Sequence, residues 1–159
     1  MSQAKKVFTR MCLNNWGGID HKVLEFHEYV NLFSGKSGSG KSTVMDAIQV
    51  ILYGSFSPSF LNKAADDAKN RRSVLSYLRG EQKDGSANRK DCDFCSVIAL
   101  EIEDTGTHII TCIGIAFEVR KSDSEIKKFV YFSHSGKMPE SEYLTEQGVC
   151  YSNQEIKKL

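Results

Sequence analysis

Apolar and polar positions alternate along much of the chain, and the period of the alternation separates strands from helices. Residues 10–34 alternate in short pieces between turn-forming residues, which predicts two or three strands, the last at 29–33. Three glycines follow within residues 35–40, and from Lys41 the apolar positions recur with a helical period until Gly54, a typical helix end. The predicted local order is therefore strand, glycine loop, helix.

The second half of the chain changes from a short helical pattern to strict alternation. Residues 71–79 place apolar side chains on one helical face, and the polar stretch 81–91 is typical of a mobile loop. Alternation on both sides of a turn at 104–106 predicts an antiparallel hairpin, and a third strand is expected at 129–132. From about residue 141 the pattern predicts a loop and the start of a polar helix.

The composition indicates a folded domain without a dominant charge. The chain has 159 residues, 40% hydrophobic and 26% charged, which suits one domain. Its 21 Lys and Arg against 20 Asp and Glu exclude a polycation that coats nucleic acid through overall charge. No apolar run approaches the roughly 20 residues of a membrane span, and no secretory signal is evident, so we expect an intracellular protein. Five irregularly spaced cysteines predict free thiols.

One motif carries chemistry. Residues 35–42, GKSGSGKS, match the Walker A pattern GxxxxGK[ST] completely. Glycines let main-chain amides close around phosphate oxygens, Lys41 brings a positive charge to the β- and γ-phosphates, and the Ser42 hydroxyl ligates Mg²⁺. The pattern therefore predicts a nucleotide-phosphate site rather than a plain Gly/Ser linker. Its residues are Gly35, Lys36, Ser37, Gly38, Ser39, Gly40, Lys41, Ser42 and Thr43.

Other motifs of P-loop proteins are missing from the sequence. Neither DxxG nor NKxD occurs, which disfavours a GTPase. Residues 97–101 approach a Walker B strand but end in Glu101 and alternate like a hairpin strand, and no LSGGQ-like signature is present. The sequence therefore assigns no catalytic base.

Several of these residues together resemble a known family. Asn15-Trp16-Gly17, followed by GKSGSGKSTVMDAIQ at 35–49, resembles the N-terminal half-head of SMC-type ATPases. RSVLSYLRG at 72–80, followed by a β-meander, is most similar to the MukB-like branch, which includes the JetC subunit of the Wadjet plasmid-defence system. The resemblance implies an α/β fold: the N-terminal half-domain of an ABC-type or SMC head P-loop NTPase, with a β-meander insertion. It would form a single lobe over 1–159, with strands, P-loop and P-loop helix at 1–60, a basic helix and loop at 61–91, the meander at 92–135, and a C-terminal loop and helix start at 136–159.

The resemblance also implies a function and partners. Because SMC-type heads carry the signature loop and Walker B after a long coiled coil, this lobe would be a fragment of a longer chain. It would bind ATP and Mg²⁺ for DNA loop extrusion, chromosome organisation or plasmid defence, and hydrolyse almost nothing alone. Its partners would be the C-terminal head lobe of the same protein, a second head in a homodimer, kleisin-like and accessory subunits, and DNA. The complex would lie in the cytoplasm at the nucleoid, without contact with a membrane. A stand-alone P-loop kinase or phosphotransferase and a non-catalytic DNA-binding scaffold remain alternatives.

Segment 61–90 is locally basic, with eight Lys and Arg against four acidic residues. The resemblance implies an arginine here that reaches the γ-phosphate or DNA, and Arg72 and Arg79 are the candidates. A solvated basic face is the equal alternative.

Three further features have a functional and a structural interpretation. Cys92 and Cys95 form a CxxC without a second ligand pair, which favours incidental thiols over zinc. Trp16 and Arg10 would border the nucleotide in such heads or serve in packing. The candidates for a Q-loop glutamine that contacts Mg²⁺ and water are Gln147 and Gln154, and the sequence does not separate them.

Overall fold

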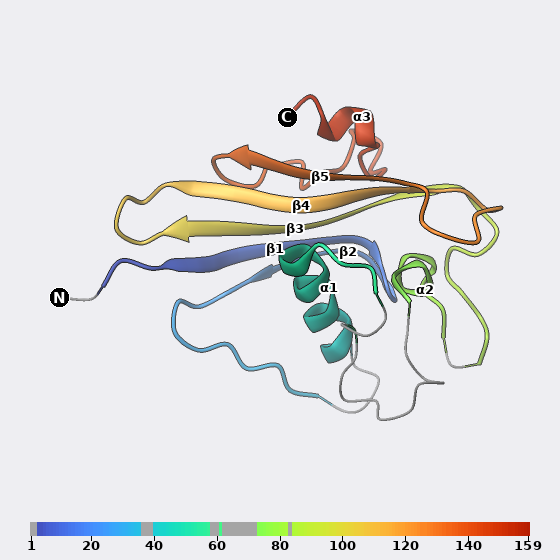
Figure 1. Ribbon diagram of the computed structural model, residues 1–159, viewed down its shortest axis with the longest axis horizontal. Coiled ribbons are helices and arrows are strands. Elements are labelled where there is room, and N and C mark those ends of the chain that lie inside the picture. The colour runs from blue at the N-terminus through green and yellow to red at the C-terminus, as the bar shows by residue number, and fades with distance from the viewer. Residues whose placement is uncertain (1–2, 36–39, 58–60, 62–72, 83) are drawn as a thin grey trace.

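A five-stranded antiparallel sheet forms the centre of the computed structural model, with strand order β2-β1-β3-β4-β5 (Figure 1). The structure describes residues 3–35, 40–57, 61, 73–82 and 84–159. Its strands are β1 (Lys6–Trp16), β2 (Ile19–Glu25), β3 (Phe94–Asp104), β4 (Ile110–Val119) and β5 (Lys128–Ser135). Its helices are α1 (Lys41–Tyr53), α2 (Val74–Arg79) and α3 (Asn153–Ile156).

The predicted hairpin and third strand are confirmed, since β3 pairs with β4 and β4 with β5. That this meander is an insertion relative to other heads stays a prediction. β1 pairs antiparallel with β3 from Lys6 to Asn14, so the meander extends the N-terminal sheet. The physical reason lies in β1, where residues 11–14 are buried on both faces of the sheet. Such a strand is stable only in the middle of a sheet, with a hydrogen-bonded neighbour on each side.

The strand expected directly before the glycine loop is not formed. β2 ends at Glu25, and residues 26–35 have no strand structure. Tyr29, Val30 and Leu32 are 78%, 75% and 86% exposed. An extended apolar segment becomes a strand only when a neighbour accepts its main-chain hydrogen bonds, and no strand of the described residues pairs with this one.

Strand alternation gives the sheet two buried faces, and each is covered by different elements (Figure 1). α1 and α2 cover the first face, and the C-terminal segment with α3 covers the second. The first core contains Met11, Leu13, Val44, Ala47, Val50, Ile51, Ile98, Leu100, Ile115 and Phe117. The second contains Cys12, Val97, Ala99, Cys112, Ala116, Met138, Tyr143, Cys150 and Ile156.

The helix ends follow local signals in the sequence. α1 ends at Gly54 as predicted, with a positive φ of 60° and its N–H bonded to the Val50 carbonyl at 2.9 Å. α2 begins after Ser73, whose hydroxyl accepts from the Ser76 N–H at 3.0 Å. The expected helix is thus confirmed from residue 74 to 79, while residues 71–72 lie outside the described residues. In the parts of the chain that the structure describes, no helix has the length and apolar character of a bilayer span.

Candidate phosphate-binding site

The Walker A loop ends on the first turn of α1. Gly40 has a φ of 92°, a backbone conformation that residues other than glycine rarely adopt, and α1 begins at the next residue. Gly35 and residues 40–43 are described. Lys36, Ser37, Gly38 and Ser39 lie outside the described residues, so their contacts with phosphate stay a prediction.

The lysine of the motif lies across the loop. Lys41 Nζ donates a hydrogen bond to the Gly35 carbonyl, which joins the two ends of the glycine loop. Ser42 is exposed, so its hydroxyl is accessible to a Mg²⁺ ion. The first bond inside the helix runs from the Val44 N–H to the Gly40 carbonyl, at 3.2 Å. The N–H groups of residues 41–43 precede this bond and point out of the positive end of the helix, where an anion is favoured.

Thr43 contributes differently from the other motif residues. Its side chain is buried, and a Cβ added at Gly17 would lie 2.6 Å from its Cγ2. Its main-chain carbonyl accepts a hydrogen bond from the Trp16 indole at 2.9 Å. Because this side chain faces the core, only its main-chain N–H is directed toward a ligand at the helix N-terminus.

Trp16 packs beneath α1, so of the two roles that the sequence left open for it, the structure shows packing. Met11 and Leu13 face α1, so simple alternation would turn residue 16 to the opposite side. Asn15 has a positive φ of 54°, which interrupts the alternation and places Trp16 in the core under α1. There the indole stacks on Tyr77 with a centroid distance of 4.9 Å.

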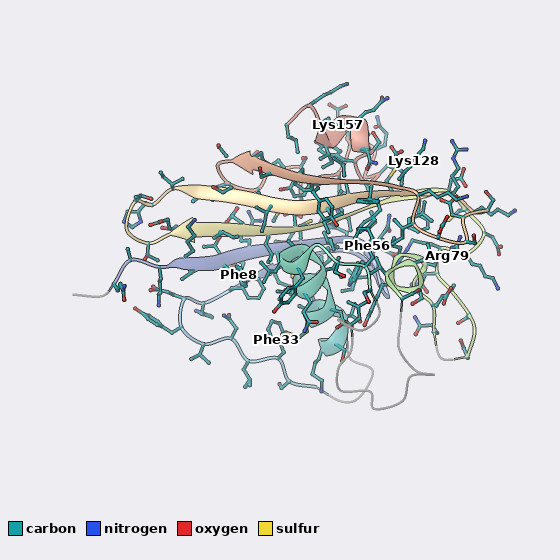
Figure 2. All side chains as sticks on the ribbon, in the orientation of Figure 1. Phe8, Phe33, Phe56, Arg79, Lys128 and Lys157 are labelled. Atoms are coloured by element: carbon teal, nitrogen blue, oxygen red, sulfur yellow. The ribbon has the colours of Figure 1, made fainter. Side chains whose placement is uncertain are left out.

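Arg79 ties α2 to the turn after β4. Its guanidinium donates to the carbonyls of Asp123, Arg120 and Lys121, the last two at 3.4 Å. Figure 2 shows Arg79 at the end of the sheet where α2 lies. A contact of Arg79 with phosphate or DNA stays a prediction, and Arg72 lies outside the described residues.

Arg10 and both glutamine candidates do not lie with the P-loop helix. Arg10 pairs with Glu142 of the C-terminal segment, with Nη2 and Oε1 3.7 Å apart. Gln147 and Gln154 belong to the same segment, which packs on the sheet face opposite α1. The structure therefore separates these three side chains from Lys41 by the sheet.

Arg89 is a residue whose role sequence reasoning missed. The stretch 81–91 was expected to be mobile, but Arg89 is 6% exposed and holds it to the sheet. Its Nε donates to the Leu78 carbonyl at 2.7 Å, its Nη2 donates to the Gly17 carbonyl, and its Nη1 lies 3.1 Å from Asp20 Oδ1. Burial lowers the pKa of the guanidinium, and the Asp20 carboxylate partly offsets this. Nothing in the local sequence distinguishes Arg89 from its exposed neighbour Lys90.

The cysteines are unpaired thiols. Cys92 is exposed, whereas burial, with Glu118 and Glu155 nearby, raises the pKa of Cys95 to about 11. Within the described ranges, no group of three or more His, Cys, Asp or Glu side chains is arranged to hold a metal ion.

Comparison with known proteins agrees with the motif. Residues 8–68 match the family described as the P-loop containing region of AAA domain, a stretch that includes the glycine loop and α1. Over 74 residues the chain is 39% identical to the SbcC component of the nuclease SbcCD from Staphylococcus haemolyticus. That match covers 44% of this chain and 6% of the relative, so the chain spans a small part of that protein's length. Together the two similarities support an SMC- or SbcC-type P-loop ATPase region, a class that uses a nucleotide and Mg²⁺.

Proposed function

We propose that this chain is the ATP-binding N-terminal lobe of an SMC/SbcC-type ATPase head that acts on DNA. The observation that carries the proposal is the complete Walker A motif at the start of α1, with Lys41 folded across the loop and Ser42 exposed. A triphosphate would compete with the Gly35 carbonyl for the Lys41 ammonium and would bind the N–H groups of the first turn. Mg²⁺ would take the Ser42 hydroxyl as a ligand.

Exposed apolar side chains support a second lobe as the partner. Tyr29, Val30 and Leu32 precede the loop, and Leu52 and Tyr53 on α1 are 49% and 69% exposed. Exposed apolar surface of this kind is typical of an interaction site. We expect the C-terminal head lobe of the same protein to pair a strand with residues 29–33 and to bring the Walker B and signature residues. Hydrolysis by this lobe alone should then be negligible.

Two relationships suggest different settings for the same head. Segment 72–80 favours the MukB-like branch with JetC, and hence DNA loop extrusion, chromosome organisation or plasmid defence with kleisin-like and accessory subunits. The identity with the SbcC component of the nuclease SbcCD favours an ATPase within a nuclease complex. Both settings include a second head in a dimer, DNA, and a cytoplasmic, nucleoid-associated location. The remainder of the reading frame would separate an SMC- or SbcC-type head from a stand-alone P-loop enzyme, since several hundred coiled-coil residues and a second half-head are expected for the head.

Calorimetric titration with Mg-ATP tests the proposed site. Lys41→Ala and Ser42→Ala should each weaken binding, because a charged or metal-ligating contact of about 1.5–3 kcal/mol corresponds to roughly 10–150-fold in affinity. Lys157→Ala is the matched control, since Lys157 lies on the far side of the sheet from α1 (Figure 2). Wild-type affinity in both P-loop variants, or no binding by the wild type at millimolar ATP, would refute the proposal.

The same preparation distinguishes the competing classes. Steady turnover of ATP by residues 1–159 alone, with a small-molecule acceptor, would indicate a kinase or phosphotransferase. DNA binding that survives Lys41→Ala, in a wild type that binds no nucleotide, would indicate a scaffold.

A further inference from the structure

Two directional hydrogen bonds fix the first turns of α1. The Trp16 indole donates to the Thr43 carbonyl at 2.9 Å, and the Tyr77 hydroxyl donates to Asp46 Oδ2. The rings of Trp16 and Tyr77 are stacked, with an interplanar angle of 8°. Trp16, Tyr77 and Asp46 are 0%, 1% and 3% exposed. The start of α1 is therefore held by polar contacts within the core.

Asp46 is an unusual residue for this position. A carboxylate is costly to bury, and the neighbouring inward positions of α1, Val44, Ala47 and Val50, are apolar. Asp46 follows Ser42 by four residues and so lies on the same side of the helix, one turn further on. Side chains of a helix lean toward its N-terminus, so the bond from Tyr77 acts on the turn that carries Ser42.

Tyr77 is itself held at a fixed place on the sheet. Its carbonyl accepts from the Gly17 N–H at 2.7 Å, in the turn between β1 and β2. Arg89 donates to the carbonyls of both Gly17 and Leu78, and so joins this turn to α2. Apolar packing alone would let α1 slide over the sheet, whereas Tyr77 connects one point of α1 to the β1–β2 turn.

We infer that Tyr77 is a positioning residue for the metal–nucleotide site. Its hydroxyl, through Asp46, sets the first turn of α1 so that the Ser42 hydroxyl meets Mg²⁺ and the N–H groups of that turn meet the phosphates. This inference rests on the proposed function. It places part of the control of phosphate and Mg²⁺ binding in α2, through the bond from Tyr77 to Asp46.

Fluorescence of Trp16, the single tryptophan of the chain, provides the assay. Trp16 bonds to the residue next to Ser42, so nucleotide binding should change its emission. Tyr77→Phe keeps the ring stack and removes the hydroxyl, and it should weaken Mg-ATP binding about fivefold or more. ATP in EDTA should lose less affinity, because the Ser42–Mg²⁺ contact is then missing. This difference separates positioning from a general loss of structure.

Tyr131→Phe is the matched control. The Tyr131 hydroxyl donates to the Gly54 carbonyl at 2.6 Å, so this variant loses a tyrosine hydrogen bond at the other end of α1. Its Mg-ATP affinity should equal that of the wild type. Asp46→Asn keeps an acceptor for Tyr77 and should restore most of the affinity that Asp46→Ala loses. The Ala variant removes the same bond from the other side, in case Tyr77→Phe folds poorly.

Three results would overturn the inference while leaving the nucleotide site in place. These are wild-type affinity in Tyr77→Phe, an equal loss in Tyr131→Phe, or a loss that is the same with Mg²⁺ and with EDTA. Failure of the proposed function gives a different result, because then the wild type itself does not respond to Mg-ATP or Lys41→Ala binds as well as the wild type.

Discussion

Replacing Arg89 with methionine should release the loop at residues 81–91 and lower the free energy of unfolding by a measurable amount. Arg89 is 6% exposed, and its guanidinium donates to the carbonyls of Leu78 and Gly17. It also lies over the Phe94 ring, 5.7 Å from its centroid. Methionine retains most of the apolar volume beside Phe94 but offers no donor to either carbonyl. The substitution therefore isolates the hydrogen bonds from the packing.

The expected loss of stability follows from the hydrogen bonds that the two carbonyls no longer accept. A hydrogen bond from a charged donor contributes about 1.5–3 kcal/mol, and a buried acceptor left without a partner costs a similar amount. Release of the guanidinium from a partly desolvated site offsets some of this, so we expect a net loss of about 3 kcal/mol. The pairing with Asp20 adds little, because the Asp20 side chain is 86% exposed.

Thermal unfolding followed by circular dichroism measures this loss. For a chain of this size about 3 kcal/mol lowers Tm by roughly 6–12 °C. Asp20→Asn is the control and should change stability by less than about 1 kcal/mol. If Arg89→Met shifts Tm no more than Asp20→Asn does, water must satisfy the two carbonyls, and the reasoning that Arg89 anchors the loop is wrong.

Two further predictions concern the sheet and the thiols. Gly114→Ala should destabilise the fold by about 3 kcal/mol in urea unfolding, because the new Cβ would lie 2.5 Å from the Ile98 carbonyl oxygen and 2.6 Å from the Phe132 ring. Gly18→Ala is the control and should be nearly neutral, because its Cβ would have no neighbour closer than 4.0 Å. Equal effects of the two substitutions would contradict the argument. Iodoacetamide at pH 8 should modify the exposed Cys92 rapidly and the other four thiols slowly, because those four are partly or fully buried. Burial raises the pKa of Cys95 and Cys112 to about 11, which leaves about 0.1% of each as thiolate at pH 8. Because the thiolate is the reactive form and its pKa is raised, the modification rate of Cys95 and Cys112 should increase as the pH rises toward 11. Mass spectrometry counts the adducts, and two or more rapidly modified sites in the folded protein would refute the prediction.

The elements that depend on near neighbours were predictable from the sequence. The helical period after Lys41, the stop at Gly54 and the hairpin around residues 104–106 are set by contacts within a few residues, and the structure confirms them. The Walker A motif is likewise a local pattern, because eight consecutive residues supply its groups. The nucleotide site could therefore be proposed before any fold was known.

Other features depend on residues far apart in the chain. The segment 29–33 has the alternation of a strand, yet it stays exposed because strand formation needs a neighbour that no local signal supplies. Arg89 resembles the exposed Lys90 in sequence, and only the convergence of Leu78 and Gly17 on its guanidinium decides that it is buried.

The sequence by itself predicted the phosphate-binding motif, and it determined the helix that follows the motif and most of the strands. The tertiary structure decided which side chains stand beside that helix. The left-handed backbone of Asn15 turns Trp16 toward α1, and the two-sided burial of β1 places the C-terminal segment, with Gln147 and Gln154, on the opposite face. The physical reason is that motif and periodicity act over a few residues, whereas the side of the sheet on which a residue lies is fixed by pairing between strands about 90 residues apart.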